Sequence, residues 1–157
     1  MHRRDFIWTS NLAATAFLPQ ITQAAELRFF SAEDAKWIDA LMAQIIPSDD
    51  APGAREAGCL YYLDKQLSEG LVRYAGNYRT GLPAFQKQHP DFLNLSFEQQ
   101  TKLLESLGTK DPFFEMLVDH TMQGFYGSPE HGGNKGHVSW NMRGIAGQMG
   151  EGHWHGK

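Results

Sequence analysis

The chain has 157 residues, of which 41% are apolar, 20% charged and 12% aromatic, and its formal net charge at neutral pH is −4. This length suits one globular domain and is too short for two. No basic run extends beyond Arg3-Arg4, so no nucleic-acid partner is expected. With Cys59 as the single cysteine, a disulfide framework, a zinc site of the usual Cys/His spacing and a C-x-x-C-H haem attachment are excluded.

The N-terminus has the pattern of an export signal. Arg3 and Arg4 form a basic start, a modestly apolar stretch follows from Phe6, and small residues at positions 22 and 24 fit a cleavage site. The arginine pair, one spacer and then Phe6-Ile7 resemble the twin-arginine signal, although His2 stands where Ser or Thr is usual. The alternative is a basic amphipathic N-terminus that stays attached. We expect residues 1–24 to be a twin-arginine export signal for the periplasm, and residues 25–157 to form a single helical domain.

Three helices are expected in the first half of that domain. Ser31 caps the first, whose apolar residues recur with a 3.6-residue period until Pro47 stops it. A second is expected over residues 54–66, with Cys59 on its apolar face as a small buried hydrophobe. A third carries apolar residues from 71 to 85, with a kink or break expected near Gly81.

Two more helices follow, each with a clear start. Ser96 with Gln99 forms a capping box for the fourth, which Gly108 ends. Asp111-Pro112 opens the fifth, and its expected inner face consists of Phe114, Leu117, Val118, Thr121 and Phe125. Because no segment alternates like a strand, the fold class is all-α: a compact bundle of about five helices with a glycine- and aromatic-rich C-terminal segment.

The segment after Gly124 is too rich in glycine to be mostly helix and too aromatic to be an ordinary linker. Glycines permit left-handed turns and close backbone approach, and large rings beside them are typical anchors of interfaces. Residues alone leave two uses open. The segment caps its own bundle, or it docks on another protein.

No catalytic, cofactor-binding or metal site is expected in this chain. Dinucleotide and phosphate-binding fingerprints are lacking. His153 and His155 have no nearby third ligand. In each of the adjacent pairs Asp119-His120 and Glu130-His131, the two side chains would point in different directions on a helix. This favours surface or hydrogen-bonded structural roles.

Three stretches together resemble the gluconate 2-dehydrogenase subunit 3 family. They are the signal, the run from Ile45 to Ala54 with its P-x-x-x-x-P-G-A pattern and the following Ala57-Gly58, and the run from Gly124 through Gly132-Gly133-Asn134 to Gly144. The resemblance covers nearly the whole chain.

The resemblance implies a large FAD-dependent partner subunit of the glucose–methanol–choline type, often with a multihaem cytochrome c that carries haem and passes electrons to the membrane. Membrane contact would be only indirect, through the complex. This chain would hold no flavin, carry the export signal for its partner through Arg3, Arg4 and Phe6, and support the partner's maturation. We place the partner interface on the family segment, at Phe125, Tyr126, Gly127, Gly132, Gly133, Asn134 and Trp140.

Two other functions are considered. The first is a stand-alone enzyme that uses Asp119, His120 or His131. The second is a periplasmic metal or haem carrier that uses His131, His137, His153 and His155. Both lack an orienting second residue at a fixed spacing.

Overall fold

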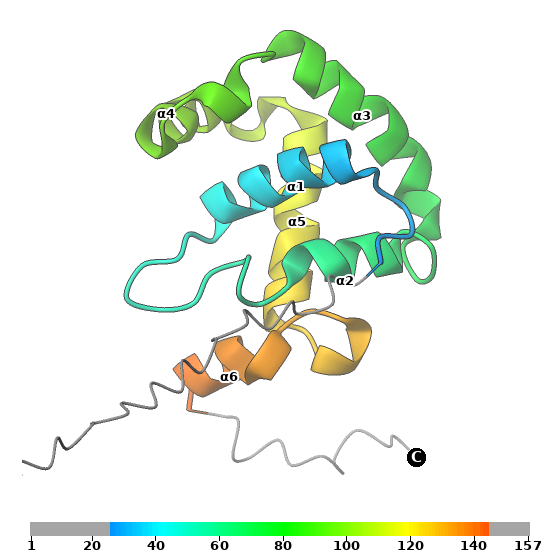
Figure 1. Cartoon of the computed structure of the whole chain (residues 1–157), viewed down its shortest axis with the longest axis vertical. Coiled ribbons are helices and arrows are strands. Elements are labelled where there is room, and N and C mark those ends of the chain that lie inside the picture. Colours follow the sequence, from blue (N-terminus) through cyan, green and yellow to red (C-terminus); the bar gives the residue numbers. More distant parts are fainter. Residues whose placement is uncertain (1–25, 145–157) are drawn as a thin grey trace, which may run out of the picture.

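The structure, a computed structural model, describes residues 26–144, which fold into six α-helices joined by loops and 3-10 turns (Figure 1). The helices are α1 (Ala32–Ile45), α2 (Cys59–Gln66), α3 (Ala75–Gln88), α4 (Phe97–Leu107), α5 (Pro112–Tyr126) and α6 (Val138–Met142). No strand occurs among these residues, so the all-α prediction is confirmed. The sixth helix is a short addition inside the glycine-rich segment, where the sequence predicted mainly non-helical chain.

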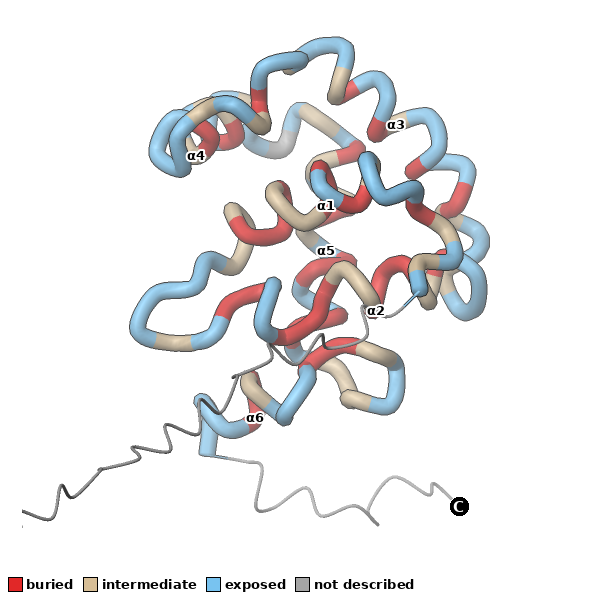
Figure 2. The backbone as a smooth tube through the Cα atoms, in the orientation of Figure 1, coloured by how far each residue is buried: buried red, intermediate tan, exposed pale blue. Residues whose placement is uncertain are grey.

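Helix α5 is the central element of the bundle. It packs against α1, α2, α3 and α6, while α4 reaches the bundle through α1 (Figure 1). Figure 2 shows the buried residues on the sides of the helices that face one another. The fully buried centre includes Ile38, Leu41, Leu63, Tyr78, Phe85 and Leu117.

The helix starts predicted from the sequence are confirmed at three sites. Ser31 Oγ accepts from the amide of Asp34 at 3.0 Å, and Ser96 and Gln99 form the reciprocal capping box of α4. Asp111 Oδ1 accepts from the amide of Phe114 at 3.0 Å, with Pro112 at the first helical position. Such caps satisfy amides that have no partner inside the helix.

Helix α2 begins later than predicted, at Cys59 rather than at residue 54. Residues 54–58 form turns, and Gly58 at the N-cap has a left-handed φ of 72°. A glycine adopts this conformation without the steric cost that a side chain would add. The apolar residues of 54–57 are nevertheless buried, which explains why the periodicity suggested a longer helix.

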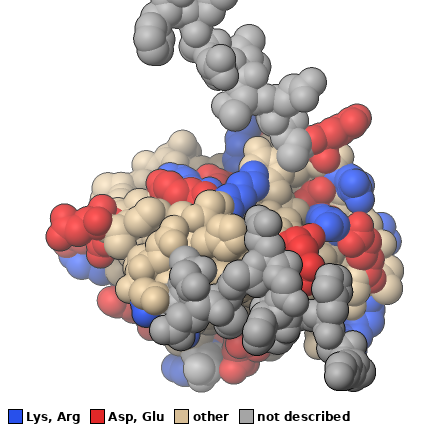
Figure 3. All heavy atoms as spheres, turned by 90° about the horizontal axis from the view of Figure 1, so that it is seen from below, with Lys and Arg blue, Asp and Glu red and all other residues tan. Residues whose placement is uncertain are grey.

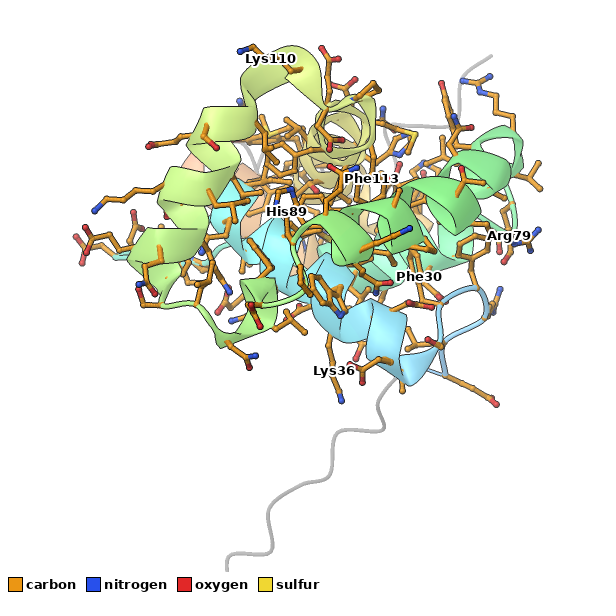
Figure 4. The ribbon with its side chains drawn as sticks, turned by 90° about the horizontal axis from the view of Figure 1, so that it is seen from above. Phe30, Lys36, Arg79, His89, Lys110 and Phe113 are labelled. Atoms are coloured by element: carbon orange, nitrogen blue, oxygen red, sulfur yellow. The ribbon has the colours of Figure 1, made fainter. Side chains whose placement is uncertain are left out.

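The sequence predicted a kink or a break near Gly81. Helix α3 runs without a break through Gly81 and Pro83, so the prediction of a break is wrong. A Cβ atom at Gly81 would lie 2.6 Å from the ring of Phe113. Figure 4 shows the labelled Phe113 next to α3. Phe113 also lies 5.8 Å from the ring of Tyr78 and 6.0 Å from that of Phe85, measured between centroids. The glycine therefore serves close packing of α5 on α3.

The inner face of α5 is rotated slightly from the predicted one. Leu117, Thr121 and Phe125 are buried as expected, whereas Phe114 and Val118 are only half-buried. Phe113, His120 and Gly124 take the remaining buried positions. None of the helices in residues 26–144 is long and apolar enough to cross a membrane.

Candidate partner interface

The loop between α1 and α2 is held in shape by its own polar groups. Gly53 lies so close to the end of α1 that a Cβ atom there would be 2.5 Å from the carbonyl oxygen of Ile46. The Glu56 carboxylate accepts from the Ser48 hydroxyl at 2.5 Å and from the Gly53 amide at 2.9 Å. These hydrogen bonds lower the pKa of Glu56 below its ordinary value, and the bond from Ser48 has the largest effect. The proline–glycine stretch is therefore an ordered loop.

Cys59 belongs to the structural part of this region. Its side chain is fully buried, and Sγ lies 3.7 Å from the carbonyl oxygen of Thr121 on α5. Burial raises the pKa of the thiol to about 12. A thiol that stays protonated at neutral pH is a poor nucleophile. The predicted role of Cys59 as a small buried hydrophobe is confirmed.

The glycine-rich segment folds around the side chain of Asn134, which is fully buried. Its Nδ2 donates to the carbonyl oxygen of Gly127 at 3.0 Å, and its Oδ1 accepts from the amide and the hydroxyl of Ser139, both at 3.0 Å. Beside it, Gly133 lies against the backbone of Gly124, where a Cβ atom would collide with the carbonyl oxygen. These contacts lay residues 127–137 back over the end of α5 and position α6.

The three aromatic residues predicted at the interface have different surroundings. Phe125 and Trp140 are buried in the chain itself, and Trp140 Nε1 donates to the carbonyl oxygen of Tyr126 at 3.2 Å. The Tyr126 side chain is 38% exposed, with the guanidinium of Arg143 lying 4.5 Å above its ring. Among the three rings, Tyr126 alone offers substantial surface to a partner.

The two family-like stretches, far apart in sequence, meet at α2. The amide of Lys135 donates to the carbonyl oxygen of Ala57 at 3.0 Å, and the Lys135 side chain covers Gly58. Gly132 lies on the backbone of Tyr62, and Gln66 Nε2 donates to the carbonyl oxygen of His131 at 3.3 Å. The loop between α1 and α2, helix α2 and residues 124–144 therefore form one continuous surface, which we call the motif face. Figure 3 views this end of the molecule, where acidic and basic side chains lie around an area of other residues.

A family model for gluconate 2-dehydrogenase subunit 3 matches residues 32–147, which includes both stretches of the motif face. The chain belongs to the gluconate 2-dehydrogenase subunit 3 family. It is accordingly a small accessory subunit of a dehydrogenase complex. No curated protein and no solved structure matches it.

A buried carboxylate anchors the start of the described chain to this subunit's motif face. Asp64 on α2 is 3% exposed and accepts from the amides of Arg28 at 2.7 Å, Phe29 at 3.0 Å and Phe30 at 2.9 Å. A buried carboxylate without such donors would be costly. The predicted signal residues Arg3, Arg4 and Phe6 lie outside the described residues, and the export function remains a prediction.

Two histidines of the described chain, His120 and His131, lie in different environments. His120 Nδ1 lies 2.8 Å from the hydroxyl of Tyr78 in the core, and burial lowers the pKa of its imidazole. This is the hydrogen-bonded structural role expected of it. His131 is exposed and lies 3.6 Å from Glu130 on the same turn. Within residues 26–144 no three potential ligands gather as a metal site would require. His153 and His155 lie outside the described part of the chain.

Sequence reasoning missed the side chains with which α2 contacts the glycine-rich segment and residues 28–30. Tyr61, Asp64 and Lys65 lie in an ordinary-looking amphipathic helix, and only their contacts with distant residues distinguish them. One available signal was the position of Asp64 among apolar residues on the buried side of α2. An aspartate is rarely found inside a protein unless its carboxylate is paired, so a partner could have been expected.

Proposed function

We propose that this chain is the non-catalytic small subunit of a periplasmic, FAD-dependent dehydrogenase of the glucose–methanol–choline type that oxidises a sugar or a sugar acid. It carries the twin-arginine export signal for the flavoprotein subunit and supports that subunit's maturation. The FAD belongs to the large subunit, and a multihaem cytochrome c would bring haem in a third. The subunit reaches the membrane only through the complex.

The observation that carries the proposal is the hydrogen bond between the Lys135 amide and the Ala57 carbonyl, because it joins the two family-like stretches into the motif face. Residues that share one surface can share one partner. Four of the predicted interface residues are buried and support that surface from beneath: Phe125, Gly133, Asn134 and Trp140. Tyr126, Gly127 and Gly132 retain exposed atoms for docking.

The composition of the motif face also supports docking. Tyr126 is an exposed aromatic ring, and the Met142 side chain beyond it is 54% exposed. Tyrosine and methionine are among the residues enriched at protein interfaces. The ordered turns around Asn134 fix the backbone under these side chains, which reduces the entropy that docking would cost.

Expression of the flavoprotein with and without this subunit tests the proposal. We expect co-expression to give a complex that co-purifies through a tag on the small subunit, shows flavin absorbance and has dehydrogenase activity in the periplasm. Without the small subunit, periplasmic activity and flavin content of the large subunit should both fall. A flavoprotein that is equally exported, flavin-loaded and active when expressed alone would overturn the proposal.

A further inference from the structure

The motif face contains a cavity of about 650 Å³ where α2 meets the glycine-rich segment. Its walls include Tyr61 and Lys65 from α2, Gly132 and Lys135 from the turns, and Leu27 from the N-terminal segment. The cavity thus lies between α2 and the glycine-rich segment, and both belong to the residues that match the family model.

Two ammonium groups of this cavity are held by uncharged groups. Lys65 Nζ donates to the carbonyl oxygen of Glu130 at 3.2 Å. Lys135 Nζ lies 4.1 Å from the centroid of the Tyr61 ring. Within residues 26–144, neither Nζ has a carboxylate oxygen within 4.0 Å, whereas Lys36 and Lys102 each pair with a glutamate. As far as residues 26–144 are concerned, Lys65 and Lys135 are therefore positioned by uncharged groups and have no carboxylate partner.

The other charged residues of the cavity are already engaged or lie at its edge. Asp64 accepts from three backbone amides, as described above. Arg28 Nη1 lies 3.2 Å from a carboxylate oxygen of Glu69. Glu26, the second acidic residue of the lining, is exposed. The two lysines consequently supply the positive charge that a ligand would meet.

We propose that this cavity receives a carboxylate side chain of the flavoprotein subunit between the ammonium groups of Lys65 and Lys135. This inference rests on the proposed function and names the chemistry of its contact. The chain as a whole is acidic, with a net charge of −4. The net charge therefore does not favour an acidic partner surface, whereas this lysine pair attracts one, which favours one orientation of docking. Charge-assisted hydrogen bonds from lysine to carboxylate supply the directional contact.

Charge reversal in the full chain tests the inference. The double variant Lys65→Glu/Lys135→Glu should weaken binding of the purified flavoprotein at least tenfold. The neutral pair Lys65→Gln/Lys135→Gln should weaken binding less and should reduce the dependence of the dissociation constant on salt concentration. The matched control is Lys36→Glu/Lys102→Glu, which reverses two exposed lysines on α1 and α4 and should bind like the wild type, with the same salt dependence.

The outcomes separate this inference from the function on which it rests. Failure of the wild-type chain to bind the flavoprotein would overturn the proposed function itself. If the wild type binds and the Lys65/Lys135 reversal binds as tightly as the control reversal, the inference alone is wrong. Thermal melting of each variant checks its fold. Should the reversal variant melt early, the neutral pair decides, because unchanged affinity and unchanged salt dependence in that pair would also overturn the inference.

Discussion

At the scale of single residues, two buried polar side chains hold together parts of the chain that no helix connects. Asp64 satisfies three amides of the N-terminal segment, and Asn134 satisfies groups on Gly127 and Ser139. Buried polar atoms stabilise a fold only when they are paired. Both oxygens of Asp64 and the side-chain amide of Asn134 have hydrogen-bond partners. Each side chain therefore specifies one arrangement of its loop.

His120 makes the stability of the subunit depend on pH. Burial is the largest cause of its lowered pKa, and Arg73 adds to the effect while Asp119 opposes it. The unfolded chain takes up a proton near the ordinary pKa of 6.5, and the folded chain resists protonation until the pH is lower. The stabilisation is therefore complete above that value and is lost as the pH falls from it towards the folded-state pKa.

We expect the melting temperature to fall between pH 7.5 and pH 5, and we expect His120→Gln to flatten this part of the profile. The exposed His131 provides the control, since His131→Gln should leave the fall unchanged. Calorimetry of the three proteins across the range measures the effect. An equally steep fall in the His120 variant would show that other groups are responsible.

At the scale of elements, the sequence predicted what is decided locally. Ser31, Ser96 and Asp111 cap the next few residues, so their patterns can be recognised without knowledge of the rest of the chain. The late start of α2 and the continuity of α3 depend on distant contacts. Gly58 is covered by Lys135, and Gly81 receives the ring of Phe113. No periodicity in one segment reports such a neighbour.

The aromatic residues of the motif face divide into support and contact, and alanine substitutions should separate the two. Phe125→Ala and Trp140→Ala remove rings that are buried in the subunit itself, so each should lower its stability by about 3–5 kcal/mol. Tyr126→Ala should change stability little and should cost about 2 kcal/mol or more of association with the flavoprotein, if the ring is a central anchor.

Melting of the isolated variants, measured alongside flavoprotein binding, distinguishes these effects. Tyr126→Phe is the matched control, because it keeps the ring on which Arg143 lies. Normal binding by Tyr126→Ala would remove this residue from the interface.

At the scale of the whole molecule, composition and helical periodicity were sufficient for the all-α fold. They also singled out both stretches of the motif face, because prolines, glycines and aromatic residues are conspicuous in a helical chain. Their contact through α2 was not predictable. It depends on a backbone hydrogen bond from Lys135 to Ala57, which any pair of residues with the right placement could form. The division between buried Phe125 and exposed Tyr126 likewise required the packing of α5.

The export hypothesis concerns the complex as a whole. If Arg3 and Arg4 address the assembled subunits for export, the double variant Arg3→Lys/Arg4→Lys should leave flavoprotein activity in the cytoplasm. Lysine keeps the charge of arginine and lacks its planar, forked guanidinium, and a loss of 1.4 kcal/mol in receptor binding is already tenfold. Activity assays on periplasmic and cytoplasmic fractions measure the outcome. Unchanged periplasmic activity would show that these arginines do not direct the transport.

The anchoring of Arg28, Phe29 and Phe30 by Asp64 also has a mechanical consequence. A pull on the chain before Glu26 is transmitted to α2 before it reaches α1, because three hydrogen bonds converge there on a single carboxylate. Helix α2 is in turn packed on α5, so the load is shared with the centre of the bundle. A force applied to the first residues during transport would therefore act on the core of the subunit. The N-terminal end of α1 would be protected from unfolding under this force.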